Sequence, residues 1–521
     1  MLRDKIGLQV ALSAVVLAAL AGSSYLALRP PAVPKAPITL KLLAQAPSDA
    51  DAIQAALISD ARAPGSAAML KFYQLRNFAP AWIDAAGARP NAMAALRLLR
   101  DAADEGLSPA SYPVSSAPQR NSAGDRIAFE LSLTQALLRF SHDLYLGQTD
   151  AITVYGVQAV SMAPRAVARH YDAVPVLVRF AAQGDASFFV RELEPAHPEY
   201  GRLKAALARY RAIDAAGGWP MVEAKPALSG DPKLPRRLLA EGYLRQSDMS
   251  AAAIKAALRT YQDRSGLAVT GTADAPTVQM LNVSAADRAA QIAANMERWR
   301  WLPSTLGDRH IMVNIADASL TFVRDGQIAL TSRVVVGLRD KQTPFLQAAV
   351  TAVTVNPIWH VPVSIIKSEI LPKIARDSSY LEANNMTMED GRVEQGPGPG
   401  NALGFAKLEM PNSQDVYLHD SPAKSAFRAR RRFLSHGCVR VELIRQLAAL
   451  TLYGDGADAS RLDDLIATGE TSRQTLAASL PVYFQYWTTL TADDGTVMFR
   501  EDVYQRDAPL IAALEVNSSD S

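Results

Sequence analysis

Cysteine is almost absent from this chain: its 521 residues include a single one, Cys438. A chain with one cysteine cannot form an internal disulfide, so no disulfide framework supports its fold. The residue is therefore incidental, a point of crosslinking between molecules, or a functional thiol. Its sequence neighbours must decide among these possibilities.

An excess of charge of either sign is also absent. The 54 Lys and Arg residues nearly balance the 52 Asp and Glu residues, which leaves a formal net charge of +2. Without a global positive field, nothing favours nucleic acid as a partner. Hydrophobic residues make up 49% of the chain, enough to build folded cores. The length suggests roughly two to four domains.

The N-terminal residues form a charged start followed by an apolar run. Arg3 and Lys5 precede a run from about Gly7 to Leu28, a pattern typical of an export signal. The run is long enough to span a bilayer as a helix, and small residues near its end could form a cleavage site. We expect residues 1–29 to be a signal-anchor or a signal peptide, with the anchor favoured. The rest of the chain would then lie outside the cytoplasmic membrane.

Helical patterns fill the first half of the chain after a Pro- and Ala-rich linker over residues 30–48. Residues 128–145 carry apolar side chains at close to helical spacing, and Gly147 follows as a stop. We expect a helical domain over residues 49–225. A second, small helical unit is expected over residues 230–285, with one helix ending near Ser265-Gly266 and another at Thr277–Leu281.

The apolar period then changes from 3.6 to 2, which predicts a β-rich domain over residues 305–455. Asp325-Gly326 is expected to be a hairpin turn. A helical insert over about 362–395 interrupts the strands, and we expect it to cover a site as a lid rather than to pack back on the sheet. Residues 456–521 are expected to be a helical and extended C-terminal segment.

The residues that carry chemistry lie near the cysteine. A thiol attacks a carbonyl group only if a base removes its proton or its pKa is lowered. His419 and His436 are the candidate bases, and spacing alone excludes neither. His436 lies two residues before Cys438, on the same face of an extended segment. His419 could reach the thiol from a neighbouring strand.

Two further residues could assist such a thiol. Gly437 permits a backbone turn that aims consecutive N–H groups at one point, which suits an oxyanion hole. Arg440 could bind a substrate carboxylate or form a structural salt bridge. Trp359 and Tyr417 could line the site or pack within the sheet.

The segment Ser435-His436-Gly437-Cys438-Val439-Arg440, with a histidine about twenty residues upstream, resembles the catalytic domain of L,D-transpeptidases of the YkuD type. Flanking segments extend the resemblance: Arg333–Gly337, Gln342–Pro344, Asn356-Pro357, Trp359, Val361-Pro362, Glu369–Pro372 and Gln395–Gly404. Residues 230–285 resemble a small three-helix peptidoglycan-binding domain through the following residues: Tyr261-Gln262, Gly266-Leu267, Thr270-Gly271, Thr277 and Leu281-Asn282.

The resemblance is to the large periplasmic branch of this family, and it implies a multidomain α+β fold. A helical N-terminal scaffold, a small three-helix peptidoglycan-binding domain and a mostly-β catalytic domain with a helical lid insert would follow one another. The chain would lie in the periplasm, anchored to the inner membrane by residues 1–29.

The resemblance also assigns roles. It implies that Cys438 is the nucleophile and His419 the general base, with no metal or other cofactor. A donor tetrapeptide of peptidoglycan would acylate the cysteine and release D-alanine, and an acceptor stem peptide would then take the acyl group in a 3–3 crosslink. It also implies that His436 lines the site, and we expect the other site-lining residues to be Ser435, Gly437, Tyr417, Arg440 and Trp359.

Alternatives remain open. Water or a protein as acceptor would make the chain an L,D-carboxypeptidase or an enzyme that attaches or releases a wall-bound protein. A zinc hydrolase is a further alternative, since His419, Asp420, His436 and Cys438 are residue types that zinc accepts. A non-catalytic wall-binding scaffold is the last. The basic run Arg428–Arg432 is either a solvated face or an attractor of acidic glycan-peptide.

Overall fold

The computed structural model describes residues 48–59, 66–117, 123–161, 171–223, 232–454 and 459–519. The predicted export segment and its linker, apart from Ser48, lie outside these residues. No helix in the described part of the chain is both long and apolar enough to span a membrane. The chain divides into two units. The first takes the described residues of Met1–Thr149, Ala163–Pro195 and Leu514–Ser521, and the second those of Asp150–Met162 and Ala196–Ala513.

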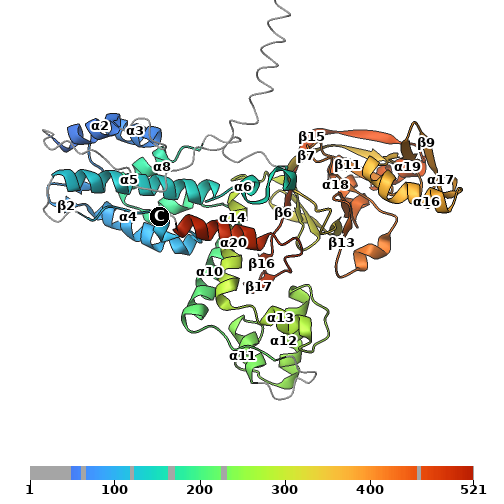
Figure 1. Cartoon of the computed structure of the whole chain (residues 1–521), viewed down its shortest axis with the longest axis horizontal. Helices are drawn as coiled ribbons and strands as arrows, with labels where there is room; N and C mark the ends of the chain where they lie inside the picture. Colours follow the sequence, from blue (N-terminus) through green and yellow to red (C-terminus); the bar gives the residue numbers. More distant parts are fainter. Residues whose placement is uncertain are drawn as a thin grey trace, which may run out of the picture. The chain divides into compact units, whose positions relative to one another are not determined.

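The first unit is built from helices, and α4 and α5 lie side by side within it (Figure 1). Helix α5 confirms the predicted helix and ends at Leu146, directly before Gly147, whose φ of +104° favours glycine. The elements are α2 (Asp49–Ser59), α3 (Ser66–Gln74), β1 (Ile83–Asp84), β2 (Gly87–Ala88), α4 (Pro90–Arg100), η1 (Asp101–Glu105), η2 (Pro109–Ser111), α5 (Ala123–Leu146), α8 (Val174–Gln183) and α9 (Ala186–Arg191).

A buried carboxylate ties the first unit together. Glu130 on α5 accepts hydrogen bonds from the backbone N–H of Ala81 (2.6 Å) and Trp82 (2.8 Å) and from the Tyr73 hydroxyl (2.9 Å). Because a buried carboxylate needs such donors, the contacts indicate a structural role for Glu130.

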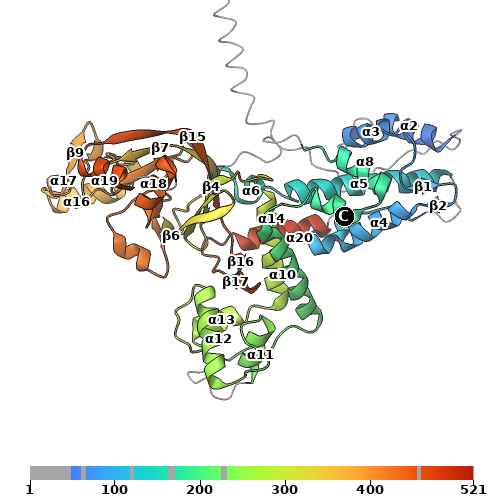
Figure 2. The ribbon, with the colours of Figure 1, turned by 180° about the vertical axis from the view of Figure 1, so that it is seen from behind.

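The second unit begins with helices, and α11, α12 and α13 form the small helical unit of the sequence prediction (Figure 2). Its apolar core includes Leu258, Tyr261 and Leu281. The fully buried Gln262 fixes the turn between α12 and α13, since its side chain accepts from the N–H of Gly271 (2.8 Å) and donates to Thr277 Oγ1 (3.0 Å). The helices are α6 (Ala151–Tyr155), η3 (Val157–Ala159), α10 (Pro198–Ala215), α11 (Lys233–Ala240), α12 (Ala251–Arg264), α13 (Ala275–Leu281) and α14 (Ala285–Arg300).

A sheet of ten strands follows, in the order β11-β12-β14-β6-β5-β4-β15-β7-β3 with β13 beside β6. Because β7 also pairs with β11, eight of these strands form a closed circuit. The strands are β3 (Val160–Ser161), β4 (Arg309–Asn314), β5 (Ser319–Arg324), β6 (Gln327–Gly337), β7 (Phe345–Val355), β11 (Ala406–Glu409), β12 (Leu418–His419), β13 (Phe433–Ser435), β14 (Val439–Val441) and β15 (Ser472–Gln485).

The predicted hairpin is confirmed at the turn between β5 and β6. Asp325 and Gly326 both have positive φ, 51° and 71°, which this two-residue turn requires. The sheet extends beyond the predicted boundary at residue 455, because β15 pairs in parallel with β4 and antiparallel with β7. Helices α18 (Ile444–Tyr453) and α19 (Ala459–Ala467) precede β15, and η5 (Lys424–Arg428) precedes β13.

The insert has a small core of its own, made from Val361, Ile366, Ile370, Met386 and Val393. Its helical part agrees with the sequence prediction, and a three-stranded sheet completes it. The elements are β8 (Trp359–His360), α15 (Val363–Ile365), η4 (Ile366–Ile370), α16 (Leu371–Arg376), α17 (Tyr380–Ala383), β9 (Met386–Glu389) and β10 (Arg392–Gln395).

The C-terminal segment contains the expected helical and extended parts, namely β16 (Thr489–Thr491), β17 (Val497–Phe499) and α20 (Asp507–Ser519). Buried polar contacts join it to α14. The Asn295 amide donates to Thr488 Oγ1 (2.9 Å), and the Arg298 guanidinium forms an ion pair with Asp507 at 2.6 Å. These contacts fix the segment against α14.

Candidate active site

Two short parallel strands, β12 and β14, bring the candidate residues together. His419 pairs with Arg440 in the register, and the N–H of Val439 donates to the carbonyl of Tyr417 at 3.1 Å. Leu418 and Val439 are fully buried in the core. Because side chains alternate along a strand, Tyr417, His419 and Arg440 lie on the opposite face from this core. The structure thus places His419 on the strand that pairs with β14, which begins directly after Cys438.

The turn before β14 presents Cys438. Gly437 has a φ of +117°, a conformation that favours glycine. The Ser435 hydroxyl donates to the carbonyl of Cys438 (2.6 Å) and accepts from the N–H of Gly437 (3.2 Å). The prediction that consecutive N–H groups point to one site is therefore wrong for Gly437, whose N–H is already used. The N–H of Cys438 donates to none of the residues that the structure describes.

The Cys438 thiol is partly exposed, and its Sγ lies 3.8 Å from the carbonyl oxygen of Asp415. Burial raises the pKa of this thiol, while hydrogen bonding to Tyr417 and the positive charges of Lys407 and Arg440 act in the opposite direction. Burial is the largest of these effects, so the thiol is expected to carry its proton at neutral pH.

His419 is almost completely buried, with 5% of its surface exposed. Burial, followed by the positive charge of Arg440, lowers the pKa of His419 to about 3, and the backbone of Asp420 acts in the opposite direction. The imidazole is therefore neutral at physiological pH. Its Nδ1 is buried and makes no hydrogen bond within the described part of the chain. A neutral imidazole on the strand next to a protonated thiol can act as a general base.

Lys407 is a neighbour of His419 and Cys438 that sequence reasoning missed. It pairs with His419 across β11 and β12, and its Nζ lies 4.1 Å from the centre of the Tyr417 ring. The Tyr417 ring in turn lies 5.4 Å from the His419 ring. Burial raises the pKa of Tyr417, with the negative charge of a Cys438 thiolate as the second cause. No motif marks Lys407, because pairing of distant strands brings it here.

His436 is directed at the insert. Its Nε2 lies 2.6 Å from Oε1 of Glu369 on η4. Glu369 also acts electrostatically on Arg440, so a carboxylate of the insert lies close to the site. Trp359, in contrast, packs against the insert's own core. The two candidate bases thus have different surroundings: His436 has a carboxylate partner, and His419 is buried on the strand next to β14.

Arg440 forms no ion pair with any described residue, and its Nε is buried without a hydrogen-bond partner there. Burial lowers the pKa of this guanidinium, and the charges of Cys438 and Glu369 act in the opposite direction. The half-buried Arg440 thus offers a free positive charge two residues after the thiol.

The residue types proposed for zinc do not converge. Across the described ranges, no group of three or more His, Cys, Asp or Glu side chains is arranged to hold a metal ion. The Asp420 carboxylate accepts instead from the backbone N–H of Phe405 (3.1 Å) and Ser421 (2.7 Å). His436 is bound to Glu369.

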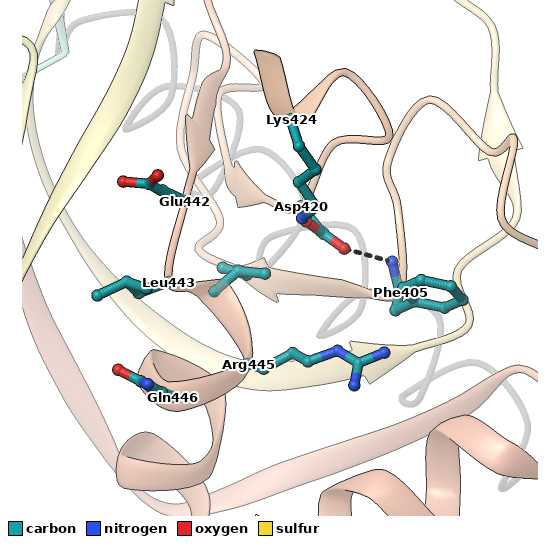
Figure 3. Close-up of a pocket in the computed structure, with 8 residues that line it drawn as sticks. Phe405, Asp420, Lys424, Glu442, Leu443, Arg445 and Gln446 are labelled. Carbon is teal, nitrogen blue, oxygen red and sulfur yellow. Dashed lines mark hydrogen bonds and ion pairs between the residues drawn. The ribbon is translucent and has the colours of Figure 1, made fainter. Parts of the chain in front are cut away.

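A pocket of about 330 Å³ lies beyond the far end of β14 (Figure 3). In Figure 3, Arg445 extends toward Phe405, and its guanidinium lies 5.1 Å from the centre of that ring. Each charged side chain in the lining already has a partner of opposite charge: Asp420 with Lys424, Glu442 with Arg333, and Arg445 with Asp463. The lining residues are Phe405, Asp420, Lys424, Glu442, Leu443, Ile444, Arg445 and Gln446.

Comparison with known families agrees with this geometry. Residues 308–473 match the L,D-transpeptidase catalytic domain, and they include both β12 and β14. The chain carries an L,D-transpeptidase catalytic domain. Residues 67–207 match a family described as the Scaffold domain.

Individual relatives of the L,D-transpeptidase domain cover parts of the chain. A Haemophilus influenzae protein named "Putative L,D-transpeptidase" is 33% identical over 250 residues, which are 44% of this chain and 50% of that protein. The chain thus spans about half the length of this curated relative.

Solved structures of L,D-transpeptidases are more distant. A mutant L,D-transpeptidase of Enterococcus faecium is 15% identical, covers 34% of this chain and 50% of its own, and has a TM-score of 0.18. An L,D-transpeptidase of Stackebrandtia nassauensis is 12% identical, covers 50% and 97%, and has a TM-score of 0.21. The assignment of the domain rests on the sequence match.

Proposed function

We propose that this protein is a cysteine L,D-transpeptidase that forms 3–3 crosslinks between stem peptides of peptidoglycan. The observation that carries the proposal is the position of a buried neutral His419 on the strand beside Cys438, within a domain of the L,D-transpeptidase family. His419 takes the thiol proton as sulfur attacks the carbonyl carbon at the L-centre of a donor tetrapeptide. The C–N bond to D-alanine breaks, and the leaving amine receives the proton.

The second half of the reaction uses the same groups. A side-chain amine of another stem peptide attacks the thioester carbonyl, a new amide C–N bond forms and the C–S bond breaks. The proton that the amine loses passes through His419 to sulfur and restores the Cys438 thiol. Arg440 supports this assignment, because its unpaired guanidinium can bind a carboxylate of the stem peptide beside the reacting bond. The reaction requires no metal in this scheme.

Product analysis tests the proposal. The purified chain is incubated with a disaccharide tetrapeptide, and products are identified by mass spectrometry. We expect a crosslinked dimer with loss of one D-alanine. Tripeptide without dimer would show that water is the acceptor, as in an L,D-carboxypeptidase. No reaction with Cys438 in its reduced form would contradict both activities.

We also propose that the insert is a lid over this site. The pair between Glu369 and His436 supports this role, because it joins η4 to the turn that holds Cys438. Both side chains are about one-third exposed, so the pair contributes only about 0.2–1 kcal/mol. Glu369→Gln is expected to raise hydrogen exchange in residues 363–376 by roughly 1.4- to fivefold.

Hydrogen-exchange mass spectrometry checks this prediction. Glu382→Gln, which removes an exposed carboxylate elsewhere in the insert, is the matched control and should leave exchange unchanged. Equal protection of residues 363–376 in the parent and in Glu369→Gln would show that the pair does not hold the insert closed.

The remaining parts of the chain fit this function. We propose that residues 230–285 bind peptidoglycan and that the helical domain over 49–225 is a scaffold. Co-sedimentation of the Cys438→Ala protein with insoluble peptidoglycan tests the first role without covalent capture, and failure to sediment would contradict it. We further propose a periplasmic location with residues 1–29 as a membrane anchor. A mature N-terminus beyond residue 29 would contradict the anchor.

A further inference from the structure

The peptide group that joins Gly437 to Cys438 is held from one side. The Thr343 hydroxyl donates to the Gly437 carbonyl at 2.7 Å, from a position 94 residues away in the sequence. The N–H of the same peptide, on Cys438, donates to no described residue. Because a peptide group is planar and trans, its C=O and N–H point in opposite directions. A contact that fixes the carbonyl therefore also fixes the direction of the Cys438 N–H.

The surroundings of Thr343 fix the direction of its hydroxyl hydrogen. Thr343 is fully buried, and its Oγ1 accepts a hydrogen bond from the N–H of Gly337 at 2.9 Å. Since the N–H of Gly337 approaches the oxygen, the hydroxyl hydrogen is directed at the Gly437 carbonyl. Gly337 allows this approach, because a Cβ at that position would lie 2.7 Å from the backbone nitrogen of Thr343.

A tyrosine from the C-terminal segment fixes Thr343 in turn. The Tyr504 hydroxyl accepts from the N–H of Thr343 (3.2 Å) and donates to the carbonyl of Gly337 (2.6 Å). The Tyr504 ring stacks on Tyr486 at 5.4 Å. Tyr504 lies beyond residues 308–473, so it is outside the part of the chain that matches the catalytic family.

We propose that Thr343 is a positioning residue that holds the Gly437–Cys438 peptide as the oxyanion-binding group, and that Tyr504 fixes Thr343 in place. The inference rests on the proposed function. When sulfur adds to the substrate carbonyl, a C–S bond forms and the π electron pair moves to oxygen. The Cys438 N–H stabilises that negative oxygen, and the hydrogen bond from Thr343 to the same peptide strengthens the N–H as a donor.

Two reactions of the same thiol separate this role from a general structural one. Acylation by a carbapenem passes through an oxyanion, whereas alkylation by iodoacetamide displaces iodide and forms none. Thr343→Val removes the hydroxyl at nearly constant shape. We expect it to slow carbapenem acylation of Cys438 by roughly 10- to 100-fold. This loss of rate is smaller than the loss caused by deleting an oxyanion donor, because the Cys438 N–H itself remains. The rate of alkylation should stay within about twofold of the parental rate, because displacement of iodide forms no oxyanion for the Cys438 N–H to stabilise.

Intact-protein mass spectrometry of the full chain follows both reactions. Thr343→Ser keeps the hydroxyl and should retain most of the parent's acylation rate, while Tyr504→Phe should slow acylation without slowing alkylation. Thr331→Val, an exposed change on β6, is the control and should match the parent.

The outcomes are distinct. Acylation of Thr343→Val at the parental rate would overturn the inference alone, as would a parallel loss of acylation and alkylation, which is the sign of general damage to the site. If the parent protein itself is not acylated by carbapenem or by a tetrapeptide donor, the proposed function fails and the inference fails with it.

Discussion

Cys438→Ala is expected to lower the release of D-alanine from a tetrapeptide donor by about 10⁵- to 10⁶-fold, the order of loss that removal of the nucleophile causes in a serine protease. The chain has no second cysteine that could take its place. Cys438→Ser should be almost equally inactive. A serine hydroxyl holds its proton far more tightly than a thiol, so the same base removes the proton from serine much less readily.

Release of D-alanine is measured by a coupled amino-acid assay, with thermal unfolding as a check of the fold. Because Cys438 is partly exposed and its side chain is small, both variants are expected to unfold near the parental temperature. Release by Cys438→Ala at more than about a hundredth of the parental rate would refute covalent catalysis at this residue.

His419→Gln is expected to slow acylation at pH 7 by roughly 10²- to 10⁴-fold, the usual contribution of a general base. The parent and the variant should also differ in pH dependence. Burial lowers the pKa of His419 to about 3, so the parental imidazole is neutral and able to accept a proton throughout pH 5–8. The parental acylation rate should therefore be nearly flat over this range and fall only as the pH approaches the His419 pKa.

Without the imidazole, acylation depends on thiol that ionises by itself. Burial raises the pKa of Cys438, so the thiolate fraction, and with it the rate of His419→Gln, should rise about tenfold per pH unit through the neutral range. Stopped-flow acylation with a carbapenem measures both profiles. His360→Gln, an exposed histidine of the insert, should keep the parental profile. A parental rate that falls steeply below pH 7 would contradict a neutral His419.

Local patterns predicted the parts of the fold that depend on neighbours in sequence. The hairpin at Asp325-Gly326 and helix α5 form as expected, because turn chemistry and apolar spacing determine them. The position of β15 between β4 and β7 could not be predicted in this way, since it depends on pairing between strands far apart in the chain.

The same limit applies to the site. Spacing alone excluded neither His419 nor His436 as the base. The pairing of β12 with β14 and the contact of His436 with Glu369 depend on segments far apart in the chain, so no local pattern reveals them. Lys407 and Thr343 carry no local sign of their positions. Thr343 stands within Gln342-Thr343-Pro344, which supports the family resemblance but does not reveal its contact with Gly437.

The most direct test of the central claim is to measure, during turnover, the mass of the peptide that contains Cys438. The parent protein is mixed with a tetrapeptide donor, quenched in acid at short times, digested and mapped by mass spectrometry. The account predicts a thioester of the donor without its terminal D-alanine on the peptide that contains Cys438, together with free D-alanine. Continuous release of D-alanine with Cys438 unmodified at every time, and equal release by Cys438→Ala, would contradict it.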